Sequence, residues 1–168
     1  QIHSYVYRHD ETAPEEHWTD VVGLDYRQPA LWDAMTDALL YWIREADIDG
    51  YRCDVAGLLP TAYWEQARAA LEKIKPVFML AEWSTPEVHR AAFDMTYDWD
   101  LYDLMTRMAQ GEASVLDLKR LITRPPVAYP ADAYRMRFTT NHDKNTWVAH
   151  DEELYGPAFK AYAVLAAT

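Results

Sequence analysis

The segment VFMLAE, residues Val77 to Glu82, decides the fold. Five apolar residues in a row are typical of a strand that is covered on both faces, as the strands of a parallel sheet are. The run ends on an acid, Glu82. In α/β barrels the loops that follow the carboxyl ends of the strands build the functional site. The segment therefore predicts a parallel strand with a candidate functional acid at its end.

Strands and helices alternate on both sides of this segment. Apolar residues at intervals of three and four predict helices, and short apolar runs bounded by glycine or proline predict strands. The expected strands are 50–56, 77–81, 93–97 and 134–140, and the expected helices are 29–49, 61–74, 101–108, 114–122 and 158–167. Four alternations indicate an α/β fold with parallel strands. Residues 1–29 are polar and broken, and we expect a loop or the end of an inserted loop domain there.

Composition excludes several classes of partner. The 168 residues carry 27 acidic and 16 basic side chains, a net charge of −11, and no basic cluster. This charge opposes binding to nucleic acid and to anionic lipid. No apolar run approaches the roughly 20 residues that cross a bilayer, so no membrane span is expected. Cys53 is the single cysteine, and its place inside an apolar strand predicts a packed thiol.

Three acids lie where strand-like runs end: Asp54, Glu82 and Asp143. Carboxylates delivered by successive strands can converge on one ligand, where they do acid/base chemistry or hold a metal. A single such acid is as readily a helix cap or a solvated loop residue. Arg52 lies two residues before Asp54, so the two side chains share a face of the strand. His142 precedes Asp143 directly.

The neighbours of these acids predict different roles. An arginine beside Asp54 keeps the carboxylate ionised and oriented, which suits a nucleophile, although Arg52 could equally be a structural ion-pair partner. Glu82 follows an apolar strand and precedes Trp83. A drier environment raises the pKa of a carboxyl group, which suits a general acid.

Three motifs resemble the alpha-amylase family of retaining glycoside hydrolases, which are built on a (β/α)8 barrel. Residues 49–56 are similar to its fourth-strand motif, residues 80–83 to its fifth-strand glutamate motif, and residues 138–143 to its seventh-strand Asn-His-Asp motif. The order fits, with 28 residues from Asp54 to Glu82 and 61 from Glu82 to Asp143. Residues 20–26 resemble the stretch that leads from the family's inserted loop domain back to the barrel. Residues 30–168 would then be half of the catalytic barrel, roughly strands four to seven.

The resemblance implies a role for each matching residue. Asp54 would be the nucleophile, Glu82 the acid and then the base, and Asp143 a third acid that binds the sugar. Substrate-binding residues would be Arg52, Asn141, His142 and Trp83. The implied reaction is hydrolysis or transfer at α-1,4-glucosidic bonds of starch or maltodextrins by double displacement, with an α-glucan as partner and no cofactor. Secreted or periplasmic enzymes are typical of this resemblance.

The sequence also departs from the family. Its first-strand motif has no match here, and many members have Lys and His where this chain has Gly57 and Leu58. We therefore expect no calcium at this point and no metal in the site. A half barrel leaves sheet edges and an apolar face uncovered. We expect a fragment of a longer enzyme that alone is inactive or weakly active, and that self-associates or pairs with the missing barrel half.

Two other functions remain open from the residues. Asp54, Glu82 and Asp143 could hold Mg²⁺, although Arg52 would repel a cation. The chain could also be a non-catalytic carbohydrate-binding or interaction module. Among the aromatic residues, Trp83, Trp99 and Trp147 follow strands and are candidates for lining a substrate groove, whereas Trp32, Trp42 and Trp64 lie on helix stripes and are expected in the core.

Overall fold

The computed structural model of this chain describes residues 24–123 and 129–168. These residues form two compact units, of which the first contains residues 24–49 and 62–77 and the second contains residues 50–61, 78–123 and 129–168. Most of the loop expected over residues 1–29, including the motif at 20–23, lies outside the described residues. Every candidate site residue belongs to the second unit.

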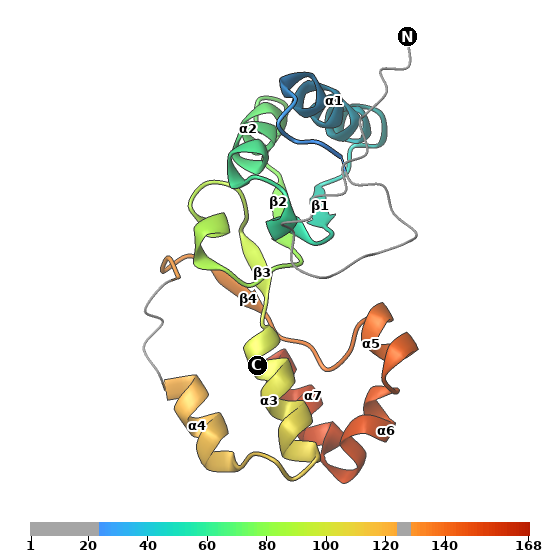
Figure 1. The fold of residues 1–168 in the computed structure, drawn as a ribbon, viewed down its shortest axis with the longest axis vertical. Coiled ribbons are helices and arrows are strands. Elements are labelled where there is room, and N and C mark those ends of the chain that lie inside the picture. Colours follow the sequence, from blue (N-terminus) through green and yellow to red (C-terminus); the bar gives the residue numbers. More distant parts are fainter. Residues whose placement is uncertain (1–23, 124–128) are drawn as a thin grey trace. The chain divides into compact units, whose positions relative to one another are not determined.

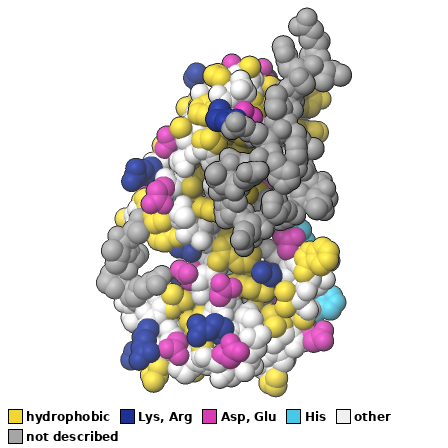
Figure 2. Space-filling model, in the orientation of Figure 1, with side chains coloured by type: hydrophobic (Ala, Val, Ile, Leu, Met, Phe, Trp, Pro, Cys, Tyr) yellow, Lys and Arg dark blue, Asp and Glu magenta, His cyan; other side chains and the backbone are white. Residues whose placement is uncertain are grey.

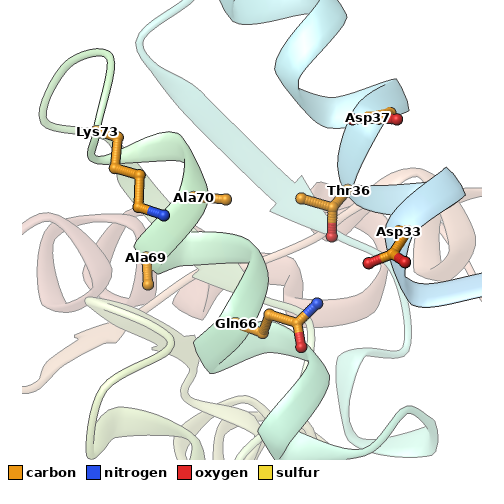
Figure 3. Close-up of a pocket in the computed structure, with 7 residues that line it drawn as sticks. All are labelled: Asp33, Thr36, Asp37, Gln66, Ala69, Ala70 and Lys73. Atoms are coloured by element: carbon orange, nitrogen blue, oxygen red, sulfur yellow. The ribbon is translucent and has the colours of Figure 1, made fainter. Parts of the chain in front are cut away.

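The first unit is built from two helices, α1 (Pro29–Ala46) and α2 (Thr61–Leu71). Proline at the first helical position starts α1, because its fixed φ suits a helix and its missing N–H is not needed there. The Tyr63 ring packs edge-on against Tyr26 and Trp32, with centroids 4.9 and 5.8 Å apart. A pocket of about 520 Å³ opens between these helices, and Figure 3 shows the residues that line it. They do not include any of the candidate site residues.

One expectation for α1 is wrong. Its buried stripe is Leu31, Thr36, Leu40 and Ile43, and Trp42 lies off that stripe with 54% of its surface exposed. Trp64 on α2 is buried as expected, at 7% exposure. The reason is geometric, since Trp42 is adjacent to Ile43 and a helix turns by about 100° between neighbours.

The second unit carries a four-stranded parallel sheet in the order β1-β2-β3-β4, as Figure 1 shows. The strands are β1 (Gly50–Cys53), β2 (Phe78–Ala81), β3 (Met95–Tyr97) and β4 (Tyr134–Met136). Parallel strands in sequential order, with α-helices following β1, β3 and β4 and a 3₁₀ turn between β2 and β3, make this part of a (β/α)8 barrel, as the sequence predicts. The remaining elements of the unit are α3 (Trp99–Ala109), α4 (Val115–Thr123), α5 (His142–Trp147), α6 (Asp151–Tyr155), α7 (Phe159–Ala167) and the short 3₁₀ turns η1 (Ala56–Leu58), η2 (Pro86–His89) and η3 (Gly156–Ala158).

The two faces of the sheet differ in burial. Register pairs Cys53 with Ala81 and Ala81 with Thr96, and these three side chains are at most 5% exposed. The opposite face carries Phe78 and Tyr134, which are 45% and 62% exposed. Because neighbouring residues in register point to the same face, this second face is one continuous, partly uncovered surface.

The fourth strand is shorter than expected, and two helices were not expected. β4 ends at Met136 instead of Thr140, because its partner β3 ends at Tyr97 and the chain then turns into α3. The last ladder contact is the hydrogen bond from Asp98 N to Met136 O, at 2.8 Å. Residues 137–140 therefore lead to α5 without strand pairing.

The surface carries mixed charge. In the region of α3 and α4, Figure 2 shows Lys and Arg side chains interspersed with Asp and Glu. One such pair is Arg120 with Asp117, whose side-chain atoms are 3.0 Å apart. Within the described residues, no helix is both long enough and apolar enough to cross a membrane.

Candidate active site

Strand register brings Asp54 and Glu82 to the same level of the sheet. Cys53 pairs with Ala81, so the two acids are the next residues of adjacent strands. A hydrogen bond of 2.9 Å from Glu82 N to Cys53 O extends the ladder to this level. Thr96 pairs with Ala81, so Tyr97 at the end of β3 lies in the same row. Side chains in one row of a parallel sheet point to one face, which aims all three groups at the same space.

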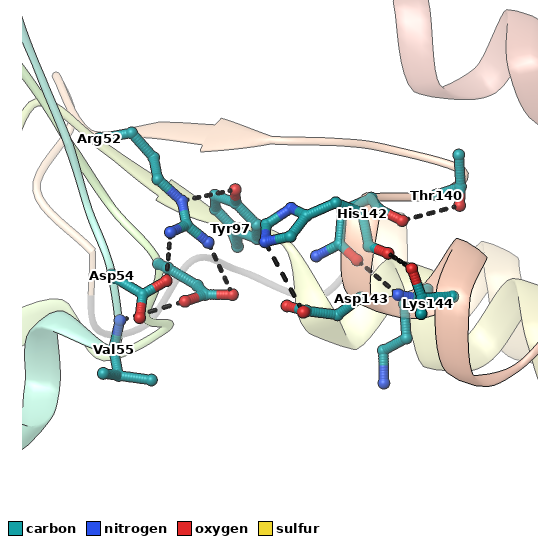
Figure 4. A network of polar contacts seen from close by, with 11 residues as sticks. Arg52, Asp54, Val55, Tyr97, Thr140, His142, Asp143 and Lys144 are labelled. Atoms are coloured by element: carbon teal, nitrogen blue, oxygen red, sulfur yellow. Dashed lines mark hydrogen bonds and ion pairs between the residues drawn. The ribbon is translucent and has the colours of Figure 1, made fainter. Parts of the chain in front are cut away.

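The Arg52 guanidinium joins the groups of this row, as Figure 4 shows. Its Nη1 binds Asp54 Oδ1, its Nη2 lies 3.0 Å from Glu82 Oε1, and its Nε donates to the Tyr97 hydroxyl at 3.3 Å. The carboxyl groups of Asp54 and Glu82 therefore bind two nitrogens of a single planar cation. That arrangement holds the two carboxyl groups close together.

The two acids experience different environments. The Asp54 side chain is 69% exposed, whereas that of Glu82 is 11% exposed. Burial raises the pKa of the Glu82 carboxyl above its usual value and outweighs the hydrogen bond from Val55 and the charge of Arg52, while the negative charge of Asp54 acts in the same upward direction. This is the direction that the sequence predicts. Burial alone would lower the pKa of Arg52, but its hydrogen bonds to Tyr97 and Asp54 raise it instead, so this guanidinium stays charged.

Val55 fixes the second oxygen of Glu82. Its backbone N–H donates to Glu82 Oε2 at 3.1 Å. Val55 has a φ of 36°, in the left-handed region that a β-branched residue seldom adopts. Such strain is maintained only where the surroundings impose it, and it clusters at functional sites. The loop after β1 is therefore shaped to deliver an N–H to the acid on β2.

Trp83 packs against the same loop at Gly57. A Cβ added at Gly57 would lie 1.9 Å from Cε2 of the Trp83 indole. The indole therefore occupies the space that a side chain at position 57 would take. This gives a physical reason for the glycine at a position where many family members carry Lys.

The Asn-His-Asp motif lies on α5 instead of at a strand end. Asn141 is the N-cap, and its Oδ1 accepts a hydrogen bond from Lys144 N at 2.8 Å. Asp143 is in the first turn, is 52% exposed, and lies 3.6 Å from Nε2 of His142. Within residues 24–123 and 129–168, no hydrogen bond or ion pair links Asp143 to Arg52, Asp54 or Glu82.

An aromatic cluster connects the two groups. The Tyr97 ring packs against Trp99 and Phe138, with centroids 5.5 and 5.3 Å apart. The Lys144 ammonium on α5 lies over the Trp99 ring, 5.3 Å from its centroid. Neither Tyr97 nor Lys144 was predicted from the sequence as a site residue. Asp54 and Glu82 were predicted because each lies where a strand ends. Tyr97 also lies at the end of a strand, so the same criterion would have identified it.

The described part of the chain holds no group of three or more His, Cys, Asp or Glu side chains placed to bind a metal ion. Cys53 is buried, and burial raises the pKa of its thiol to about 12. Its thiol is therefore protonated at neutral pH, as a packed core residue is. The polar chemistry of the site rests on carboxyl, guanidinium and phenol groups.

Replacement of Gly57 by alanine should displace the Trp83 indole. The added Cβ meets an aromatic ring, and overpacking of this kind costs about 1–3 kcal/mol. Urea unfolding would measure the loss, and the indole N–H resonance of Trp83 would report the displacement. Gly111→Ala is the control for the Trp83 resonance, because its Cβ meets no atom within 4 Å; its φ of 77° is left-handed, unlike that of Gly57, so the stability of this control also includes backbone strain. An unmoved Trp83 resonance in Gly57→Ala would contradict the packing described.

The pKa of Glu82 should make stability depend on pH. A carboxyl group with a raised pKa binds its proton more readily in the folded state, so it stabilises the fold at low pH and loses this effect as the pH rises through its folded pKa. As the pH rises from 4.5, the ordinary pKa of the carboxyl, through its raised folded pKa, the unfolding free energy of Glu82→Gln should therefore rise relative to that of the unaltered chain. Carbon-13 NMR titration of the carboxyl, assigned by its loss in Glu82→Gln, measures the pKa directly. A value at or below 4.5 would refute this assignment.

Comparison with known proteins gives a consistent family. No protein-family model matches the chain. It is 30% identical over 127 residues to a cyclomaltodextrinase of Geobacillus thermopakistaniensis. The matched region covers 71% of this chain and 22% of the relative. A maltogenic alpha-amylase structure from Thermotoga neapolitana matches with 38% identity and a TM-score of 0.69, over 74% of this chain and 29% of that one.

An alpha-amylase structure from Lactobacillus plantarum matches with 35% identity and a TM-score of 0.71, over 82% of this chain and 36% of that one. The chain spans about a fifth of the length of the curated relatives it matches. These likenesses agree with the parallel sheet and with the order of the three acidic motifs. The chain belongs to the alpha-amylase family, of whose members it spans a part.

Proposed function

We propose that this chain supplies the nucleophile and the acid/base of a glycoside hydrolase that cleaves or transfers α-1,4-glucosidic bonds with retention, as part of a longer enzyme. The observation that supports it most is the shared guanidinium, since Arg52 binds an exposed Asp54 and a buried Glu82 at once. A retaining mechanism needs its two carboxyl groups about 5–5.5 Å apart. Adjacent strands about 4.8 Å apart, in register, suit that separation.

In the first step, ionised Asp54 attacks the anomeric carbon. The bond between this carbon and the leaving oxygen breaks, and an ester to Asp54 forms. Glu82 gives its proton to the leaving oxygen. Its burial supports this role, because a raised pKa keeps part of the Glu82 population protonated as the pH rises. The ion pair with Arg52 fixes the orientation of the Asp54 carboxylate.

In the second step, Glu82 acts as a base. Its carboxylate takes a proton from a water molecule, whose oxygen attacks the anomeric carbon and releases Asp54. Two inversions at the same carbon restore the original configuration. When the acceptor is a sugar hydroxyl instead of water, the same step transfers the glycosyl unit. Asp143 and His142, on the exposed turn of α5, would bind sugar hydroxyls.

The substrate class is inferred from relatives. The names of matching proteins are cyclomaltodextrinase and maltogenic alpha-amylase, which points to α-glucans such as maltodextrins for this chain. The rest of the barrel would cover the sheet face that carries Phe78 and Tyr134. Residues 30–168 would then be half of the catalytic barrel, preceded over residues 1–29 by the end of a loop domain.

Asp54→Asn should abolish the reaction. We expect a loss of about 10⁴-fold or more in kcat on maltoheptaose, because the amide is a poor nucleophile. The full-length parent protein is the enzyme to assay, with this chain alone beside it, and proton NMR would follow product size and anomeric configuration. Asp117→Asn is the matched control, since Asp117 also pairs with an arginine, but on α4. Products of inverted configuration, or equal rates in the two variants, would refute the proposal.

Trp147 should contribute a stacking surface for the glucan. It lies four residues after Asp143 on α5, on the same helix face, and is 82% exposed. Trp147→Ala should weaken maltoheptaose binding by about tenfold, measured by calorimetry with Asp54→Asn protein to prevent turnover. Trp42→Ala removes an exposed indole on α1 and should leave the affinity unchanged. The same affinity in both variants would exclude Trp147 from the binding surface.

A further inference from the structure

A buried tyrosine supports the guanidinium on which both acids depend. Tyr97 closes β3 and is 5% exposed. Its hydroxyl accepts a hydrogen bond from Arg52 Nε at 3.3 Å, and the Arg52 guanidinium carbon lies 5.8 Å from the centre of its ring. Of the three groups that hold this cation, the two acids are the ones proposed to change charge during the reaction. The Tyr97 phenol is the partner that takes no part in the proposed proton and glycosyl transfers.

The three nitrogens of the guanidinium are thereby divided among three strands. Nη1 binds the acid that follows β1, Nη2 the acid that follows β2, and Nε the hydroxyl at the end of β3. A planar fork held at three points cannot rotate about its own axis. Without the contact at Nε, the fork could turn toward the exposed Asp54, and Glu82 would lose its charged partner.

The surroundings of Tyr97 make it rigid. Its ring packs against both Trp99 and Phe138, and its backbone N–H donates to Trp83 O at 3.1 Å. Its carbonyl accepts from Arg135 Nη2 at 3.1 Å. Ring and backbone are both constrained, so the hydroxyl position is set by the core and not by the substrate.

We propose that Tyr97 is a positioning residue that holds the Arg52 guanidinium in the orientation that binds Asp54 and Glu82 together. This inference rests on the proposed function for its effect on catalysis, but the orientation itself can be tested without any reaction. The hydroxyl does not touch the reacting atoms. It acts through Arg52.

Tyr97→Phe tests this assignment, because it removes the hydroxyl and retains the ring. The charge of Arg52 lowers the pKa of Glu82, so a guanidinium that turns away should raise the Glu82 pKa above its value in the unaltered chain. Carbon-13 NMR titration of Glu82 in this chain measures that shift. Asp54 is the other charged group that acts on Glu82, and repeating the titration in an Asp54→Asn background removes its contribution.

Tyr102→Phe is the matched control. Tyr102 is 3% exposed and stacks on Phe138 in the same aromatic cluster, and its hydroxyl is not a partner of Arg52. It should leave the Glu82 titration unchanged. Urea unfolding and circular dichroism establish that each variant is folded. If Tyr97→Phe is unfolded, Tyr97→His and Tyr97→Leu replace it in the test. Histidine keeps a ring nitrogen as a polar partner for Arg52, so the pKa of Glu82 should be nearer to its value in the unaltered chain in Tyr97→His than in Tyr97→Leu.

In the parent enzyme, Tyr97→Phe should lower kcat about tenfold and leave KM nearly unchanged, since Tyr97 is buried and acts through Arg52. A Glu82 pKa that is the same in the Phe variant and the unaltered chain would overturn the inference. The two proposals can fail separately. If the unaltered parent enzyme is inactive but Tyr97→Phe still raises the pKa of Glu82, the proposed function is refuted and the positioning role of Tyr97 stands.

Discussion

The site depends on one guanidinium that is shared by two carboxyl groups. Arg52 on β1 binds both Asp54 and Glu82, and it has the Tyr97 hydroxyl as a third partner. Two acids this close repel each other when both are charged, and a cation between them reduces the repulsion. The exposure of Asp54 and the burial of Glu82 then separate their behaviour. Two residues of similar chemistry can therefore take opposite roles.

Parallel register creates this arrangement. The residues that directly follow β1 and β2 lie in one row with the last residue of β3, so Asp54, Glu82 and Tyr97 point to one face without any special loop geometry. The loops then refine the site. Val55 in a left-handed conformation donates to Glu82, and Trp83 packs against Gly57. The loop after β1 and the residue after β2 thus hold each other in place.

The four-stranded sheet has one face that is not fully covered. One face is buried, and the other exposes Phe78 and Tyr134. Exposed aromatic residues on a sheet face are unfavourable in water and suit contact with further protein. The second core of this unit, around Met105, Tyr155 and Tyr162, is by contrast closed and well buried. The core formed by α3, α6 and α7 is therefore buried, whereas the sheet face that would line a barrel interior is partly exposed.

Much of the fold and the central acids followed from the sequence. An uninterrupted apolar run such as 77–81 reports a strand covered on both faces, and Asp54 and Glu82 follow directly from where such runs end. These signals are local, because each depends on a few adjacent residues. Trp42 was misplaced for the same reason, since a stripe of apolar residues does not say which of two neighbouring positions faces the core.

Contacts between distant segments were determined only by the tertiary structure. The three-way binding of Arg52 joins residues up to 45 positions apart, and the support from Tyr97 exists only once β3 lies beside β2 in register. The end of β4 at Met136 was set by where its partner strand stops, which placed Asp143 on a helix. Residue types and strand ends can be predicted from short segments of the chain. Contacts between segments depend on register and burial, which arise only when the strands pack together.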